Sequence, residues 1–282
     1  MADRFANPSV EPVLELRGLH HTFRGGADAV IALRGVDLTL AAGAFVVVVG
    51  PNGSGKSTLL DVVAGSVVPN RGSVRLGGED ATRWPVHRRA RVVGRVFQNP
   101  FTGTAPHLTV AENLALANRR AAGTRKLRRA LDRRLRGTLR DRLASLGMRL
   151  EDRLDTPAES LSGGQRQALA ILMATLVRPT LLLLDEHTAA LDPRSAEQVL
   201  QLTRDVVSRD RLTTLMVTHS MQQAARIGDR LLMMHDGRVV HDFEGTRRKR
   251  LHVQELLDRF DEIRNADLLD DSGVALLRRQ YV

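Results

Sequence analysis

The stretch FVVVVGPNGSGKSTLLDVVAG, residues Phe45 to Gly65, decides the fold. Its β-branched start indicates a buried strand, and the apolar spacing of its second half indicates a helix. The loop between them fits the phosphate-binding pattern G-x-x-x-x-G-K-[ST] from Gly50 to Ser57. Its glycines allow a tight turn whose amide N–H groups, with the positive end of the following helix dipole, suit β- and γ-phosphates. The sequence therefore predicts an α/β fold that binds a nucleotide.

Two side chains of this loop carry its chemistry. Lys56 supplies a positive point charge to the phosphates, and the Ser57 hydroxyl is placed to ligate Mg²⁺. A glycine-rich turn without a ligand is the alternative, but the flanking strand and helix favour the phosphate loop. The residues predicted to contact the nucleotide here are Gly50, Pro51, Asn52, Gly53, Ser54, Gly55, Lys56, Ser57 and Thr58.

A second apolar run, LLLLDEHTAALDP from Leu181 to Pro193, ends in two adjacent carboxylates. Burying a carboxylate costs several kcal/mol unless it is paired or bound to a metal. Beside a phosphate loop, Asp185 can approach the magnesium ion, whose charge offsets that cost. Glu186 points the other way and is the predicted general base toward an attacking water. Without the phosphate loop, a solvent-exposed strand end would explain both acids.

A third motif, LSGGQRQALAIL from Leu161 to Leu172, identifies a family. With the two motifs above, it resembles the nucleotide-binding subunit of an ATP-binding cassette (ABC) transporter over residues 13–244. The resemblance implies a P-loop NTPase cassette with a RecA-like core, a small antiparallel β subdomain and an α-helical signature subdomain at about residues 99–175. It also implies a head-to-tail dimer, expected to be a homodimer, in which each signature binds the γ-phosphate of ATP held by the other subunit. The matching signature residues are Ser162, Gly163, Gly164 and Gln165.

The remaining family elements follow in the expected order. Gln98, in VFQNP, matches the glutamine that contacts Mg²⁺ and water, and Asp192, in AALD, belongs to the segment that crosses the dimer interface. His219, in MVTHS, matches the switch histidine beside the γ-phosphate; without this context it would be read as a satisfied polar residue. Phe23 lies where an aromatic ring stacks on adenine, although a core position is an equal alternative.

One position departs from the common family pattern. Most relatives carry proline after the catalytic glutamate, whereas this chain has His187, which keeps a backbone N–H and can titrate near neutral pH. The letters DEHTAALDP resemble a subgroup of bacterial importer-type subunits tied to uptake of amino acids or related small solutes. A tolerated loop substitution is the alternative interpretation.

Composition limits the partners and the location. The 282-residue chain has no apolar run near the roughly 20 residues that cross a bilayer and no secretory leader pattern, so we expect a peripheral protein at the cytoplasmic face of the membrane. The net charge of +10 invites a nucleic-acid interpretation. However, the densest basic segment, residues 119–142, lacks aromatic residues and places leucines 127, 131, 135 and 139 near one face of a helix. A solvated amphipathic helix is favoured, with contact to anionic lipid as an alternative, and no nucleic acid is expected.

The chain therefore divides into an ATPase domain at residues 13–244 and a C-terminal helical extension at 245–282, in which Val253, Leu256, Leu257 and Phe260 share a helical face. The expected cofactors are ATP and Mg²⁺. The expected partners are integral membrane permease subunits, a second nucleotide-binding subunit and an extracytoplasmic solute-binding protein. The segment LTVAENLALA is typical of the surface that receives a permease helix. A soluble cassette ATPase acting on nucleic acid or ribosomes, and a regulator of a membrane protein without transport, remain alternatives.

Overall fold

The computed structural model describes residues 11–25, 28–122 and 133–262. Its strands are β1 (Leu14–Gly25), β2 (Asp28–Leu40), β3 (Phe45–Val49), β4 (Arg71–Leu76), β5 (Glu79–Asp80), β6 (Val93–Val96), β7 (Leu181–Asp185), β8 (Thr214–Val217), β9 (Arg230–His235) and β10 (Arg238–Glu244). Its helices are α1 (Lys56–Ala64), α2 (Val86–Arg89), α3 (Val110–Ala122), α4 (Arg133–Ala144), the 3-10 turn η1 (Ala158–Ser160), α5 (Gly163–Thr175), α6 (Pro193–Asp210), α7 (Met221–Arg226) and α8 (Gly245–Arg250).

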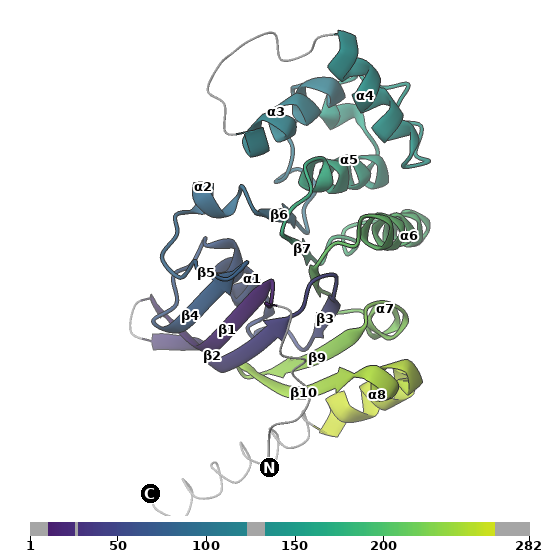
Figure 1. The fold of residues 1–282 in the computed structure, drawn as a ribbon. Helices are drawn as coiled ribbons and strands as arrows, with labels where there is room; N and C mark the ends of the chain where they lie inside the picture. The colour runs from purple at the N-terminus through teal and green to yellow at the C-terminus, as the bar shows by residue number, and fades with distance from the viewer. Residues whose placement is uncertain (1–10, 26–27, 123–132, 263–282) are drawn as a thin grey trace, which may run out of the picture.

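The central sheet has six strands in the order β10-β9-β3-β8-β7-β6 (Figure 1). All neighbouring pairs from β9 to β6 are parallel, and only β10 runs antiparallel at the edge. The predicted strands FVVVV and LLLLD are β3 and β7. Parallel strands are covered on both faces, which is why they read as continuous apolar runs. The carboxyl ends of β3, β6, β7 and β8 therefore meet at one edge, where the predicted site lies.

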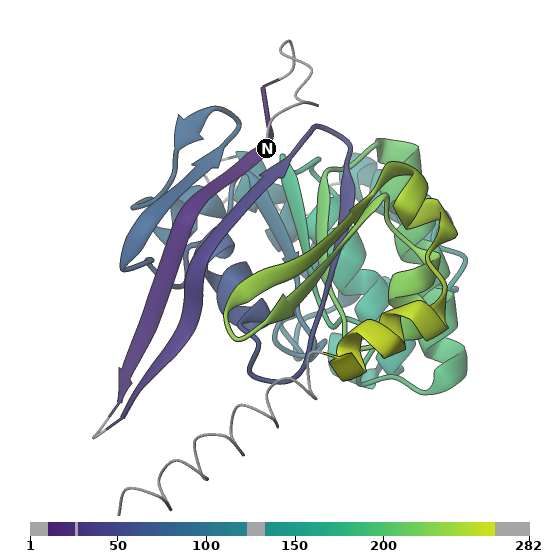
Figure 2. The same ribbon diagram turned by 90° about the horizontal axis from the view of Figure 1, so that it is seen from below.

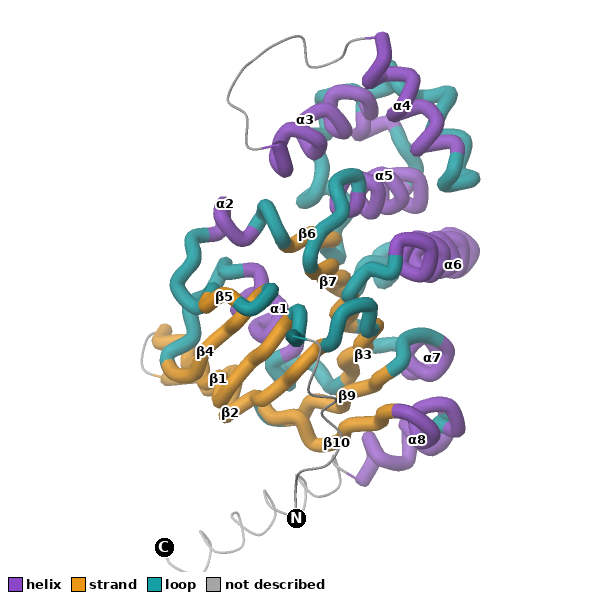
Figure 3. The backbone as a smooth tube through the Cα atoms, viewed as in Figure 1, coloured by secondary structure: helices purple, strands orange, loops and turns teal. Residues whose placement is uncertain are grey.

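Alternate residues of the central strands face two separate apolar clusters. Val47 and Leu182 pack with residues of α3 to α7, whereas Val46 and Leu183 pack with α1 and the small sheet. Figure 1 shows the same division, with α5, α6 and α7 on one side of the sheet and α1 with β1, β2 and β4 on the other. The tube in Figure 3 separates the strand layers from the helices that cover them. The helix that follows the phosphate loop and the helix that follows the signature thus lie on opposite faces.

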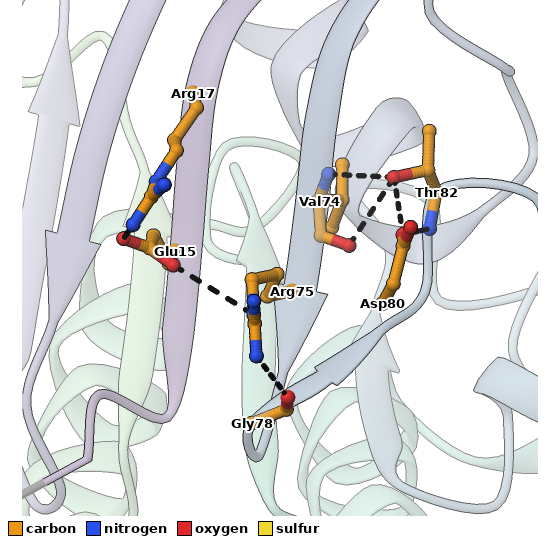
Figure 4. Close-up of polar contacts among 7 residues, drawn as sticks. All are labelled: Glu15, Arg17, Val74, Arg75, Gly78, Asp80 and Thr82. Carbon is orange, nitrogen blue, oxygen red and sulfur yellow. Dashed lines mark hydrogen bonds and ion pairs between the residues drawn. The ribbon is translucent and has the colours of Figure 1, made fainter.

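The small antiparallel subdomain is a four-stranded sheet in the order β2-β1-β4-β5, as predicted. β1 and β2 form a long hairpin that projects from the molecule (Figure 2). Polar contacts hold the β4–β5 turn in place (Figure 4): the Thr82 hydroxyl accepts from the Val74 amide at 3.0 Å and donates to Asp80 at 2.6 Å. Arg75 donates to the Gly78 carbonyl at 2.6 Å and approaches Glu15 of β1 at 3.8 Å. These contacts tie the β4–β5 turn to the neighbouring strands of the small sheet.

The helical subdomain comprises α3, α4, η1 and α5. Leu139 of α4 is buried and Leu135 packs against the same cluster, whereas Arg134 and Arg140 are exposed. The amphipathic pattern predicted for this basic segment therefore holds in α4. Leucines 127 and 131 of that prediction lie outside the described residues.

The C-terminal extension begins with α8 and continues as a helix over residues 253–262. Leu256 is fully buried in the cluster beneath α7, and Val253 and Phe260 are half-buried. Leu257 shares the helical face of these residues but is 39% exposed. Arg248 of α8 donates to the Ala224 and Ile227 carbonyls at the end of α7. The extension therefore packs on the cassette through Arg248, Leu251 and Leu256, and residues 263–282 lie outside the described part.

Candidate nucleotide-binding and catalytic site

The phosphate loop joins β3 to α1 and has glycines where side chains would not fit. Gly55, with φ of +96°, precedes α1, and a Cβ there would lie 2.3 Å from the Ala32 carbonyl of β2. A Cβ on Gly50 would lie 2.2 Å from the Met234 carbonyl of β9. No side chain caps the N-terminus of α1. The amide N–H groups of this first turn are therefore open to an anion, as phosphate binding requires.

Lys56 is the charged centre of the loop. Its side chain curls back, so that Nζ donates to the Gly50 carbonyl at 2.9 Å and the Pro51 carbonyl at 2.8 Å. Burial lowers the pKa of Lys56, and the nearby carboxylates of Glu186 and Asp185 oppose that shift. An ammonium held by neutral carbonyls in a loop of glycines is well placed to meet phosphate oxygens.

Ser57, Asp185 and Gln98 were predicted as the magnesium residues, and they supply one hydroxyl, one carboxylate and one amide oxygen. This donor set fits a hard cation that also keeps water and phosphate ligands. Ser57 is exposed on the first turn of α1, and Asp185 ends β7 with 14% of its side chain exposed. Gln98 follows β6, where Val96 is opposite Leu184, so Gln98 lies level with the end of β7. It is exposed, and its role stays a prediction.

Asp185 has a partner that the sequence analysis missed. Arg95 of β6 donates from Nη2 to Asp185 at 2.8 Å and from Nη1 to Asp61 of α1 at 2.6 Å. An arginine in the buried strand VGRV needs a carboxylate partner. That burial argument could have flagged Arg95, although it could not have chosen Asp61, which lies 34 positions away.

Glu186 and His219 are brought into contact. Glu186 has a φ of +43°, its amide donates to the Val217 carbonyl at 3.0 Å, and Oε2 lies 3.2 Å from Nδ1 of His219. A left-handed conformation at a non-glycine residue is strained, and such strain is found where structure directs a side chain to a task. Here the left-handed conformation of Glu186 turns its carboxylate away from that of Asp185. The two adjacent acids thus have different partners, Arg95 for Asp185 and His219 for Glu186.

A buried polar network ties the two loops that carry these residues. The hydroxyls of Thr188 and Thr218 both donate to Oε1 of Gln223, at 3.1 and 3.2 Å. Thr188 lies two positions after Glu186, and Thr218 directly precedes His219. Gln223 of α7 therefore fixes the spacing of the loops. No motif in the sequence pointed to it.

The signature begins α5 with a closed cap. The Ser162 hydroxyl accepts from the Gln165 amide and the Gln165 side chain accepts from the Ser162 amide, both at 3.3 Å. A Cβ on Gly164 would lie 3.1 Å from Cβ of Ser195, so this helix start packs closely on α6. Asp192 caps α6 by accepting from the Ser195 amide at 3.0 Å. The signature and the predicted interface segment therefore form one rigid unit.

His187 is buried, with 1% of its surface exposed. Its Nε2 lies 2.9 Å from the Thr203 hydroxyl of α6, which donates to the Val199 carbonyl, so Nε2 is the donor to Thr203. Burial lowers the pKa of His187 to about 4. The expectation that it titrates near neutral pH is therefore wrong, because a buried imidazole without an acidic partner stays neutral. His187 is a packing residue between the catalytic loop and α6.

Phe23 is 44% exposed on β1, so the alternative of a core position is wrong. It pairs with Val30 of β2, which lies two residues from the Ala32 carbonyl that abuts Gly55. An exposed aromatic ring at this position on the hairpin, near the strand residue that abuts the phosphate loop, suits stacking on the base of a nucleotide whose phosphates lie in that loop. Stacking on adenine stays a prediction.

Comparison with known proteins identifies the family of this chain. The family model described as ABC transporter matches residues 33–189, more than half of the chain. The chain is 42% identical over 219 residues to the tyrosine transport ATP-binding protein of Clostridioides difficile, covering 78% of this chain and 86% of that protein. It is 40% identical over 231 residues to the lipoprotein-releasing system ATP-binding protein LolD 1 of Caulobacter vibrioides, covering 80% and 94%.

A solved dimeric bacterial ABC transporter cassette is 28% identical, with a TM-score of 0.71 over 82% of this chain and 98% of that one. A post-hydrolysis dimer bound to ADP and phosphate matches equally well, with a TM-score of 0.71. No helix in the described residues is long and apolar enough to cross a membrane. From the family model, the relatives and the assembled site, the chain belongs to the ABC transporter family as an ATP-binding subunit, and it is an ATPase coupled to transport.

Proposed function

We propose that this protein is the ATP-hydrolysing subunit of a multi-subunit transporter that imports an amino acid or a related small molecule through partner permeases. The observation that carries the proposal is the placement of two anion-binding helix starts, those of α1 and α5, on opposite faces of one sheet. A relative with 42% identity is named for tyrosine transport, which supports the substrate class.

Within one chain, the described residues divide the work of phosphoanhydride hydrolysis. Lys56 and the loop amides bind the β- and γ-phosphates, and Glu186 accepts a proton from the water that attacks the γ-phosphorus. His219, at 3.2 Å from Glu186, orients that carboxylate and contacts the γ-phosphate. Mg²⁺ held by Ser57, Asp185 and Gln98 would neutralise charge on the phosphate oxygens. Phe23 stacks on the adenine.

The signature must act on a nucleotide held by another chain. Ser162 begins the helix that covers one face of the sheet, whereas Lys56 begins the helix on the other face. A head-to-tail pair of chains brings each signature to the partner's phosphate loop, with Asp192 at the interface. All site elements are intact in this chain, so a homodimer with two equivalent sites is proposed.

The permease contact is proposed for the groove between the end of β6 and the helical subdomain. A cavity of about 270 Å³ there is lined by residues that include Phe97, Leu116 and Met173. Leu116 of α3 is 51% exposed, and Phe101, one position before the lining residue Thr102, is 50% exposed. Such exposed apolar side chains around a groove suit a short permease helix. Binding there would hold the protein at the cytoplasmic face of the membrane, and an extracytoplasmic solute-binding protein would deliver the substrate.

The test is solute uptake in cells that lack the gene, complemented with the wild-type protein or with Glu186→Gln. Restored uptake of a labelled amino acid, tyrosine first, by the wild type only is the expected result. Normal uptake in cells without the protein would exclude that substrate class. Isolation of the tagged protein from gently solubilised membranes then identifies its partners. Recovery with ribosomes, or with a lipoprotein-handling complex, instead of a permease and a solute-binding protein would overturn the import proposal.

A further inference from the structure

Arg95 joins two elements that flank the predicted cation. It lies on β6, opposite Leu183 of β7, and only 15% of its side chain is exposed. One guanidinium nitrogen donates to Asp185 at 2.8 Å and another to Asp61 at 2.6 Å. Burial opposes the charge of Arg95, but its hydrogen bonds to Asp185 and Asp61, together with their negative charges, outweigh burial and raise the pKa of Arg95. The guanidinium is therefore a permanently charged bridge between β7 and α1.

Asp61 is four residues after Ser57 on α1, so both side chains lie on the same face of that helix, one turn apart. The bond from Arg95 to Asp61 therefore fixes the face of α1 that presents the Ser57 hydroxyl. The bond from Arg95 to Asp185 fixes the end of β7. The guanidinium of Arg95 thus joins Asp185 to the helix that carries Ser57, and the cation is proposed to lie between those two residues.

The bond to Asp185 also selects one of its oxygens. Arg95 contacts Oδ2, and in the described part of the chain Oδ1 has no hydrogen-bond or ion-pair partner. Holding one carboxylate oxygen by a planar donor leaves the other with a defined direction. Residues that orient metal ligands in this way typically change metal affinity by about 10–100-fold when removed.

We infer that Arg95 is a positioning residue that sets the spacing and orientation of Ser57 and Asp185 for the divalent cation. The inference rests on the proposed function in that those two residues hold the cation. A purely structural ion pair is the competing explanation, and it predicts lost stability without a specific change in cation binding.

The experiment measures binding of Mn²⁺, by electron paramagnetic resonance, to the full-length protein saturated with ADP. In Arg95→Gln the dissociation constant of Mn²⁺ is expected to rise about tenfold or more. Arg95→Lys keeps the charge, but one ammonium cannot span both carboxylates, so an intermediate value is expected. Asp61→Asn breaks only the contact to α1 and should act in the same direction.

Arg230→Gln is the matched control. Arg230 of β9 is also largely buried, at 21% side-chain exposure, and forms a two-pronged pair with Asp242 at 2.8 and 2.5 Å. Its loss should lower the unfolding temperature without changing Mn²⁺ binding. If Arg95→Gln behaves in the same way, with a lowered unfolding temperature and unchanged Mn²⁺ affinity, the inference is overturned.

Two further variants separate the possible failures. Asp185→Asn must weaken Mn²⁺ binding; if it does not, the assignment of Asp185 in the proposed function fails, whatever Arg95 does. If Asp185→Asn weakens binding and Arg95→Gln does not, only the inference on Arg95 fails. Should Arg95→Gln not fold, Asp61→Asn carries the same test, and wild-type Mn²⁺ affinity in that variant would contradict the inference.

Discussion

The two helix starts that are proposed to bind phosphate, those of α1 and α5, are built differently. α1 begins with Gly55 in a left-handed conformation and no side-chain cap, whereas α5 begins with Ser162 and Gln165 capping each other. The first turn of α1 therefore offers open amides and the buried ammonium of Lys56. The start of α5 already satisfies two of its amides within the chain. The difference supports the proposal that α1 binds nucleotide in a single chain and that α5 contributes only when a second chain presents a phosphate to it.

The largest expected effect is on ATP hydrolysis, the step proposed to need the helix starts of both α1 and α5. Glu186→Gln removes the proton acceptor but keeps the side-chain shape, so turnover should fall about 10²–10⁴-fold while ATP binding persists. The variant should accumulate as a dimer with ATP, visible by size-exclusion chromatography with light scattering. Glu197→Gln, on an exposed α6 residue that pairs with Arg226 at 3.8 Å, is the control and should behave as wild type. Normal turnover in Glu186→Gln would remove it as the base.

The next largest effect tests the start of α1, which is proposed to bind nucleotide within a single chain. Lys56→Ala removes charge-assisted bonds to phosphate worth about 1.5–3 kcal/mol, so affinity for a fluorescent ATP analogue should fall by about a hundredfold at the upper end. The loss should be the same in dilute protein, where chains are monomeric. Lys249→Ala, exposed on α8, is the matched control. Unchanged affinity in Lys56→Ala would mean that the loop does not bind phosphate.

A third effect concerns His187, in the loop that joins β7 to α6. His187 has a pKa of about 4 in the folded chain and 6.5 as its ordinary value, so the unfolded state binds more protons below pH 6.5. Its contribution to stability is present above pH 6.5 and is lost as the pH falls toward 4. Between pH 7 and pH 5 the wild type should therefore lose about 2 kcal/mol of unfolding free energy through this residue.

Urea unfolding of wild type and His187→Gln at pH 7, 6 and 5 checks this expectation. The pH dependence, not the absolute stability, should shrink in the variant, and exposed His252→Gln should keep the wild-type dependence. The pH profile of ATP hydrolysis between pH 6 and 8 should be the same in His187→Gln as in the wild type. A shifted profile would restore the view that this histidine titrates during turnover.

The contrast between local and distant features also explains what the sequence could predict. The strands β3 and β7 and the loops at their ends were predictable because buried parallel strands read as apolar runs and the motif residues are adjacent. The contact between Glu186 and His219 was not predicted; it follows from the pairing of β7 with β8, which the structure shows. The Arg95 bridge could not be predicted, because its partners are 34 and 90 positions away and no local period encodes them.

The burial of individual side chains was the other property that could not be predicted from the sequence. His187 and Phe23 were each assigned two environments from sequence, and only the packing of α6 and the projecting hairpin decided between them. A single histidine in a loop carries no periodic signal, so its buried place beside Thr203 depended on how α6 packs on the catalytic loop. In the same way, Leu257 fits the helical period but is 39% exposed.

The smallest expected effect tests most directly whether α1 and α5 act on nucleotides held by different chains. Ser162→Ala removes a helix cap worth about 1 kcal/mol and the hydroxyl proposed to meet the partner's nucleotide. In a Glu186→Gln background, ATP-dependent dimerisation should weaken by about fivefold, measured by analytical ultracentrifugation, whereas nucleotide affinity in dilute protein should change less than about twofold. Ser160→Ala is the matched control, because its exposed hydroxyl donates to the Pro157 carbonyl at 2.8 Å outside the cap. If Ser162→Ala weakened nucleotide binding in the monomer, α5 would be acting on its own chain's nucleotide, and the opposite faces of the sheet would no longer explain why two chains are required.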